Sequence, residues 1–170
     1  MNVTLIGMVG VGKSVLGRAL ARKMRTLCID TDRLIEKKTG RKLQKLIDTI
    51  GEDRFLTLEK DTVIGLALKK ASGYVISPGG SVVYSPEAMR YLRKNTKIIF
   101  LAAPLATIRA HIKNRSSRGI VGLEKKNLAR LYAERLPLYK KYAHLKVRVG
   151  KNMTVNQVVD KILKSIEMCP

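Results

Sequence analysis

The chain has 170 residues, of which 45% are apolar, and this length fits one domain with a buried core, residues 1–170. No run approaches the roughly 18 uncharged apolar residues of a membrane-spanning helix, so we expect no membrane partner. The formal net charge of +21 favours an anionic substrate or partner instead.

Short apolar runs alternate with amphipathic segments along the chain. The first half is predicted to contain, in order, a strand at Val3–Ile6, a helix at Ser14–Lys23, a strand at Thr26–Ile29 and helices at Arg33–Lys38, Leu43–Ile50 and Asp53–Lys70. A strand at Tyr74–Ile76, a helix at Glu87–Lys94, a strand at Lys97–Leu101 and a helix at Leu105–Lys113 follow. The remainder is predicted as a polar loop at Asn114–Gly122, a helix at Leu123–Ala143 interrupted at Pro137, a strand at Lys146–Val149 and a helix at Val155–Met168. Such short, apolar strands are typical of a central parallel sheet with helices on both faces, a three-layer α/β/α fold.

The distribution of charge and cysteine narrows the partners and the compartment. Basic residues are spread from Lys13 to Lys164, and no aromatic cluster offers a platform for stacking bases. This favours a basic enzyme that attracts small anions over a nucleic-acid-binding protein, which strongly salt-dependent retention of DNA or RNA would indicate. Cys28 and Cys169 lie too far apart in the sequence for a zinc motif, and the simplest compartment is a reducing cytoplasm.

A phosphate-binding loop is predicted between the first strand and the first helix. The stretch from Gly7 to Ser14 matches G-x-x-x-x-G-K-S/T in the structural context that the motif requires. Its glycines let backbone N–H groups face phosphates, Lys13 should reach the β- and γ-phosphates of ATP, and the Ser14 hydroxyl should bind Mg²⁺. The predicted ATP-binding residues of this segment are Gly7, Gly10, Val11, Gly12, Lys13, Ser14 and Val15. A chance glycine-rich turn is a weak alternative, because four positions and both flanking elements agree.

Two carboxylates, Asp30 and Asp32, follow the second predicted strand. In an open α/β sheet, ligands bind at the carboxyl ends of the strands. One carboxylate there could support Mg²⁺, and the other could accept a hydrogen bond from an attacking hydroxyl. Alternatively, Asp32 could cap the helix that follows. The residues alone leave both interpretations open.

At this point the sequence resembles the shikimate kinase family over essentially its whole length. The resemblance rests on the loop Gly7 to Ser14, Asp30-Thr31-Asp32 with Ile35-Glu36, Gly51-Glu52 with Phe55 and Glu59, Gly79-Gly80, and Arg135-Leu136-Pro137-Leu138-Tyr139. It implies a P-loop kinase with a helical substrate-binding region at about residues 31–62 and a lid at about residues 113–124. It also implies transfer of the γ-phosphoryl group of ATP to a hydroxyl of shikimate.

The resemblance also implies roles for individual residues. Asp30 would bind Mg²⁺ together with the Ser14 hydroxyl, and Asp32 would hydrogen-bond the acceptor hydroxyls. Gly79 and Gly80 would bring backbone N–H groups to the acceptor, and Arg135 would pair with its carboxylate. Arg118 would be the lid arginine that closes over the phosphates and contacts ATP. The implied catalytic residues are Lys13, Asp32 and Arg118.

Three positions depart from the family pattern. Leu56 stands where family members have an arginine that binds the acceptor carboxylate, and losing such a contact lowers affinity by roughly ten- to a hundredfold. Ser81 replaces the third glycine of a triplet. Gly119, in place of a proline after Arg118, should make the lid more flexible.

These departures keep several alternatives open. The chain could phosphorylate a different small hydroxylated acceptor, or it could be a non-catalytic ATP-binding regulator. A nucleoside monophosphate kinase shares this architecture, although Asp32, the Gly79-Gly80 turn and Arg135 favour a shikimate-like acceptor. A monomer is expected from size and family. The two histidines, His111 and His144, are expected to be surface residues.

Overall fold

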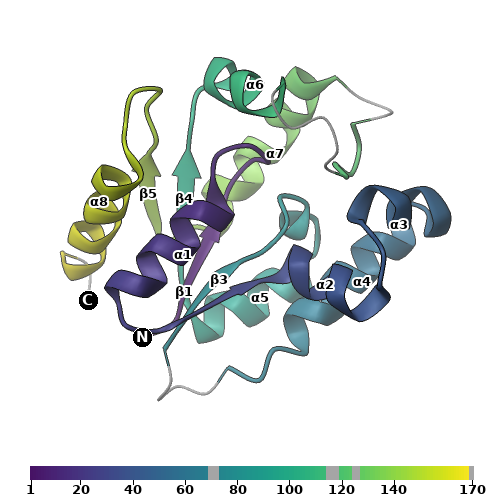
Figure 1. Ribbon diagram of the computed structural model, residues 1–170, viewed down its shortest axis with the longest axis horizontal. Helices are drawn as coiled ribbons and strands as arrows, with labels where there is room; N and C mark the ends of the chain where they lie inside the picture. The colour runs from purple at the N-terminus through teal and green to yellow at the C-terminus, as the bar shows by residue number, and fades with distance from the viewer. Residues whose placement is uncertain (69–72, 114–118, 124–126, 169–170) are drawn as a thin grey trace.

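The computed structural model describes residues 1–68, 73–113, 119–123 and 127–168, and Figure 1 shows the arrangement of their helices and strands. In chain order the elements are β1 (Val3–Ile6), α1 (Lys13–Lys23), β2 (Leu27–Asp30), α2 (Thr31–Thr39), α3 (Leu43–Ile50), α4 (Glu52–Ile64) and β3 (Tyr74–Ser77). They continue with the 3₁₀ helix η1 (Val82–Tyr84), α5 (Pro86–Asn95), β4 (Lys97–Ala102), α6 (Leu105–Lys113), α7 (Leu128–Tyr142), β5 (Leu145–Arg148) and α8 (Val155–Glu167).

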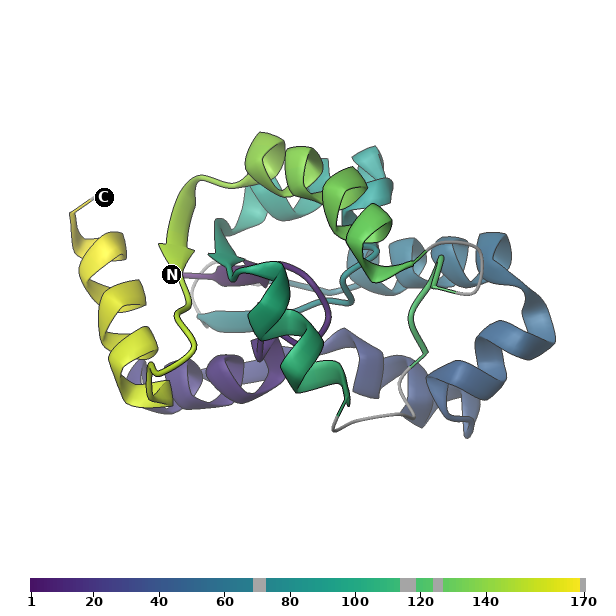
Figure 2. The ribbon, with the colours of Figure 1, turned by 90° about the horizontal axis from the view of Figure 1, so that it is seen from above.

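The sheet is parallel throughout and has the strand order β2-β3-β1-β4-β5. Helices α1 and α8 cover one face, while α5 and α7 cover the other, as the second view shows (Figure 2). The central strands are therefore buried on both sides, which explains why β4 is apolar from Ile98 to Ala102 and why the hydroxyl of Thr4, the one polar side chain of β1, is hydrogen-bonded to that of Thr96. The three-layer α/β/α fold predicted from the sequence is confirmed.

The strand order places three loops beside one another. From β1 the chain crosses to β2 on one side, and from β3 it crosses over β1 to β4 on the other side, which creates a switch point between β1 and β3. Because the strands are parallel, the loops that follow β1, β2 and β3 all emerge at the same carboxyl edge. The start of β1 and the end of α8 lie at the opposite edge (Figure 1).

Helices α2, α3 and α4 project from the sheet and have a small core of their own (Figure 1). Ile35, Leu46, Ile47 and Phe55 are buried there. Val121, from the segment at 119–123, completes this cluster although it is distant in sequence. These three helices therefore pack on one another and on the segment that precedes α7.

Two predicted helices differ from the structure by more than two residues at one end, while the others agree within two residues. Helix α4 ends at Ile64 rather than Lys70, because Gly65 follows it and Leu66 and Leu68 turn back onto the main core. Helix α7 begins at Leu128 rather than Leu123, with the Asn127 side chain accepting a hydrogen bond from its first turn.

The predicted interruption of α7 at Pro137 is also wrong. The helix runs on to Tyr142, although Pro137 has no N–H to donate to the carbonyl one turn earlier. Within the described ranges, none of the helices combines the length and the apolar character that crossing a bilayer requires.

Candidate active site

A cavity of about 580 Å³ opens at the carboxyl edge of the sheet. Its lining comes from the loop after β1, the start of α1, the β2–α2 junction, the α2–α3 turn, α4, the turn after β3, the segment at 119–121, and α7. The lining residues are Val9, Gly10, Gly12, Lys13, Ser14, Val15, Arg18, Asp30, Asp32, Arg33, Glu36, Lys42, Leu43, Phe55, Pro78, Gly79, Gly80, Ser81, Gly119, Ile120, Val121 and Arg135. Most of the predicted phosphate-binding residues and all four predicted acceptor-binding residues thus share one cavity, whereas Gly7 and Val11 do not line it.

The phosphate-binding loop is closed by the side chain of Lys13. Gly12 caps α1 with a φ of 98°, a left-handed conformation that favours glycine. The Lys13 ammonium donates hydrogen bonds to the carbonyl oxygens of Gly7 and Met8, at 2.8 Å and 3.2 Å. Burial lowers the pKa of Lys13 to about 8, against the attraction of Asp32, Glu59 and Asp30. An anion bound in the cavity would offset this cost of burying the ammonium.

Of the two carboxylates after β2, Asp30 is the one that caps α2. Its Oδ1 accepts a hydrogen bond from the backbone N–H of Arg33 at 3.2 Å, so the capping role considered for Asp32 belongs to Asp30. Both carboxylates line the cavity.

The donor set at this point fits Mg²⁺, a cation that prefers carboxylate, hydroxyl and phosphate oxygens. Ser14 and Asp30 face the same cavity. The buried Ser77 Oγ, next to Asp30 in the β2–β3 pairing, has no hydrogen-bond partner in the described part of the chain. The described residues contain no cluster of three or more His, Cys, Asp and Glu side chains that could hold a metal ion. Mg²⁺ in proteins is usually held by one or two protein oxygens together with water and substrate phosphates.

The turn after β3 approaches its surroundings too closely for a side chain at Gly79. A Cβ on Gly79 would lie 2.0 Å from Glu59 Oε1 and 2.9 Å from Asp32 Oδ1. A Cβ on Gly80 would lie 3.2 Å from Nη1 of Arg135. The structure therefore brings Asp32, Gly79, Gly80 and Arg135 together at one end of the cavity.

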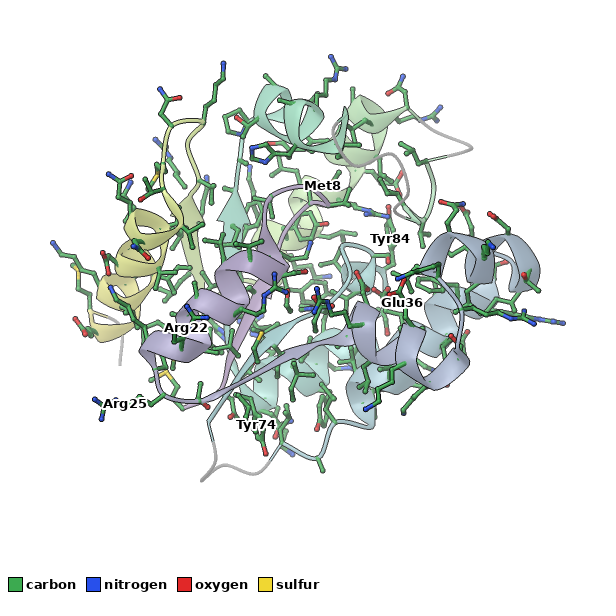
Figure 3. The ribbon with its side chains drawn as sticks, viewed as in Figure 1. Met8, Arg22, Arg25, Glu36, Tyr74 and Tyr84 are labelled. Carbon is green, nitrogen blue, oxygen red and sulfur yellow. The ribbon has the colours of Figure 1, made fainter. Side chains whose placement is uncertain are left out.

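Arg135 is only 1% exposed and is held by contacts on two sides. Its Nη2 donates to the Val121 carbonyl at 2.8 Å and its Nε donates to the Tyr84 hydroxyl at 3.1 Å. The guanidinium also lies 5.0 Å from the centre of the Tyr84 ring. Figure 3 labels Glu36, which lines the cavity, Tyr84, which contacts Arg135, and Arg22, which lies on the exposed side of α1. The Nη1 group beside Gly80 is the part of Arg135 that faces the acceptor end.

The three departures from the family pattern have structural counterparts. Leu56 does not line the cavity and packs against the small core of α2, α3 and α4. Ser81 donates a hydrogen bond from its buried hydroxyl to Glu59 Oε2 at 2.7 Å. A Cβ on Gly119 would lie 2.7 Å from the backbone nitrogen of Gln44, so glycine lets this segment approach α3.

Some predicted site residues lie elsewhere. Val11 lines a second cavity of about 350 Å³, which lies on the other side of the phosphate-binding loop and also contacts α8. His111 is exposed, as expected, but it lines this second cavity and its Nδ1 donates to the Gly10 carbonyl at 2.8 Å. Gly7 receives the Lys13 hydrogen bond through its carbonyl. Arg118 lies outside the described residues.

Sequence reasoning missed several residues of the first cavity. Arg18, Arg33, Glu36 and Lys42 line it, and Lys42 forms an ion pair with Glu36 at 3.5 Å. Arg18 could have been found, because it lies one helical turn after Ser14. The positions of Arg33 and Lys42 depend on how α2 and α3 pack, which no local pattern revealed.

Comparison with known proteins agrees with this geometry. The model of the family described as shikimate kinase matches residues 9–167. A shikimate kinase of Pelotomaculum thermopropionicum is 37% identical over 164 residues, covering 95% of this chain and 93% of that protein. A shikimate kinase of Sulfurihydrogenibium sp. is 31% identical over 166 residues, 98% of each chain.

Among solved structures, a shikimate kinase from Acinetobacter baumannii in complex with shikimate superposes with a TM-score of 0.84. It is 27% identical in sequence, and the match covers 98% of this chain and 93% of that one. The sequence motifs, the fold and these matches agree over nearly the full length. The chain belongs to the shikimate kinase family.

Proposed function

We propose that this protein transfers the γ-phosphoryl group of ATP to a hydroxyl of shikimate, with Mg²⁺ as the cofactor. The observation that carries the proposal is the single cavity that Lys13 shares with Asp32, Gly80 and Arg135. Phosphoryl transfer depends on positioning and charge neutralisation, and a cavity of this kind supplies both.

At the nucleotide end, the Lys13 ammonium would exchange its contacts with loop carbonyls for contacts with phosphate oxygens. Ser14 and Asp30 would hold Mg²⁺, which neutralises charge on the phosphates when it is bound. The second cavity, with His111 at its edge, adjoins the same loop and would accommodate the nucleoside part of ATP. Arg118 would add positive charge from the lid.

At the acceptor end, Asp32 would orient the attacking hydroxyl and accept its proton. The backbone at Gly79 and Gly80 would contact the ring hydroxyls, and Arg135 Nη1 would pair with the carboxylate. Because position 56 carries a leucine, Arg135 would bind that carboxylate without a second arginine from α4, although Arg33 and Lys42 also line the cavity. A less negatively charged acceptor is the second candidate, and the apolar Leu56 is the observation that favours it.

The decisive experiment measures ADP release with MgATP and shikimate for the wild type and for Leu56→Arg. Thr57→Arg is the matched control, since it adds the same charge at an exposed position of the same helix. Wild-type turnover would establish the function, with Arg135 sufficient for the carboxylate. Turnover only in Leu56→Arg would indicate a different natural acceptor. No turnover in either, with ATP still bound, would overturn the proposal in favour of another acceptor or an ATP-binding regulator.

The proposed enzyme acts as a monomer in the cytoplasm. One chain supplies every group assigned to ATP and shikimate, and ATP is the phosphoryl donor that a cytoplasmic enzyme would use. The excess of positive charge would then serve to attract two anionic substrates. Sedimentation at several protein concentrations tests the monomer.

A further inference from the structure

Glu59 of α4 is a carboxylate buried directly beneath the turn that follows β3. The residue is 1% exposed, and its Oε2 accepts a hydrogen bond from Ser81 Oγ at 2.7 Å. Its Oε1 is buried and has no hydrogen-bond partner among the residues that the structure describes. Buried polar atoms normally have partners, so this carboxyl group needs an explanation.

Oε1 of Glu59 occupies the space that a side chain on Gly79 would need. Oε1 lies 2.0 Å from where a Cβ on Gly79 would be, while Oε2 contacts Ser81, two residues later in the same turn. Glu59 therefore contacts both ends of the turn, and Gly80 between them faces Nη1 of Arg135. A displacement of Glu59 would change the position of the backbone groups that line the acceptor end of the cavity.

The position of Glu59 is not fixed by an ion pair to a neighbouring charge among the described residues. No ion pair within 4.0 Å of Glu59 occurs among the described residues. Asp32 from α2, Lys13 from α1 and Arg135 from α7 act on it at longer range. Burial, and next the charge of Asp32, raise the pKa of Glu59 to about 7, while the Ser81 hydrogen bond and the charges of Arg135 and Lys13 oppose this shift. Leu56, one helical turn before Glu59, brings no charge to this face of α4.

We propose that Glu59 and Ser81 are positioning residues that hold the Gly79–Gly80 turn against the acceptor, and that Ser81 supplies the restraint which an apolar Leu56 cannot. This inference rests on the proposed function. It makes positions 56 and 81 energetically coupled, although one lies on α4 and the other in the turn after β3. The serine at position 81 then compensates for the leucine at position 56, and the two are not independent departures from the family pattern.

The test is a double-mutant cycle with Ser81→Ala and Leu56→Arg, measured with shikimate and MgATP. Ser81→Ala should raise the KM for shikimate about tenfold, as expected for a lost hydrogen bond to a charged group, and change the KM for ATP less than twofold. Leu56→Arg should restore most of this loss in the Ser81→Ala background, because an arginine one turn from Glu59 can pair with it. Thr57→Arg, on the exposed side of the same helix, should not.

The pH dependence of the KM for shikimate distinguishes a positioning role of Glu59 and Ser81 from a role in stability alone. Ionised Glu59 repels an acceptor carboxylate held at Arg135, so the KM for shikimate should rise as the pH increases through the pKa of Glu59. Ser81→Ala should move this rise to higher pH, because the Ser81 hydrogen bond favours the ionised form. Glu59→Gln should abolish it. A loss of thermal stability alone, with an unchanged pH profile, would overturn the positioning role.

Failure of the proposed function is distinguishable from failure of this inference. If the wild type binds ATP but does not turn over shikimate, the proposed function is wrong. The coupling between positions 56 and 81 is then tested by measuring the free energy of unfolding of the wild type, the two single mutants and the double mutant. Coupling between Ser81→Ala and Leu56→Arg in that cycle would sustain the pair. Additive effects, or equal rescue by Thr57→Arg, would refute it.

Discussion

Lys13 should take up a proton when MgATP binds at mildly alkaline pH. Its pKa in the free protein is about 8 because the ammonium is buried, whereas the usual value is 10.5. This difference corresponds to about 3 kcal/mol in favour of the neutral amine. At pH 8 the amine is therefore about half protonated in the free protein. A triphosphate beside it favours the charged form, so binding should draw in about half a proton.

Isothermal titration calorimetry measures this uptake directly. The binding enthalpy of MgATP at pH 8 is compared in two buffers whose ionisation enthalpies differ, and the slope gives the number of protons exchanged. At pH 6.5 the slope should be close to zero, because Lys13 is already charged there. Lys13→Arg is the control, since an arginine stays protonated at both pH values.

A slope near zero at pH 8, with MgATP binding intact, would refute this account of Lys13. It would mean that the carbonyl oxygens of Gly7 and Met8 and the more distant carboxylates fully offset the cost of burial. The same slope in the wild type and in Lys13→Arg would place the proton on another group.

Three further perturbations test the acceptor end. Gly79→Ala puts a Cβ 2.0 Å from Glu59 Oε1 and should lower kcat/KM for shikimate at least tenfold. Gly65→Ala is the control and should leave kcat/KM within twofold, because Gly65 lines neither cavity and its φ of −71° suits alanine. Arg135→Met should raise the KM for shikimate by about ten- to a hundredfold with little change in the KM for ATP, and steady-state kinetics would contradict the assigned role if both constants rose together. Glu59→Gln should flatten the pH dependence of the free energy of unfolding. The pKa of Glu59 in the folded protein is raised from 4.5 to about 7, so wild-type stability should fall as the pH rises through this window. Urea unfolding of both proteins at several pH values measures the difference.

The parts of the molecule that could be predicted from the sequence are those encoded locally. The phosphate-binding loop is specified by its own glycines and Lys13, and β1 has the predicted bounds because its four residues, three of them apolar, stand between Asn2 and Gly7. The end of α4 was missed because apolar residues continue past it. The start of α7 was missed because Asn127 was not recognised as its N-cap. Leu66 and Leu68 pack onto the core without being helical, so apolar spacing alone could not mark the end of α4.

The contacts that shape the acceptor end could not be predicted in the same way. Ser81 and Glu59 are 22 residues apart, and Arg135 and Tyr84 are 51 residues apart, so each pair exists only after the sheet and helices have packed. The resemblance to a family placed Arg135 at the acceptor, but nothing in the sequence indicated that the Val121 carbonyl would occupy one of its nitrogens. Side-chain partners of this kind depend on tertiary structure, which local patterns do not encode.

The position of the chain ends has a practical consequence. Strand β1 starts, and helix α8 ends, at the edge of the sheet opposite the cavity (Figure 1). An affinity tag, a fluorophore or a surface linker attached at either end would therefore sit away from the substrates. The protein can be immobilised for surface-based binding measurements with the nucleotide and acceptor sites left open to solution.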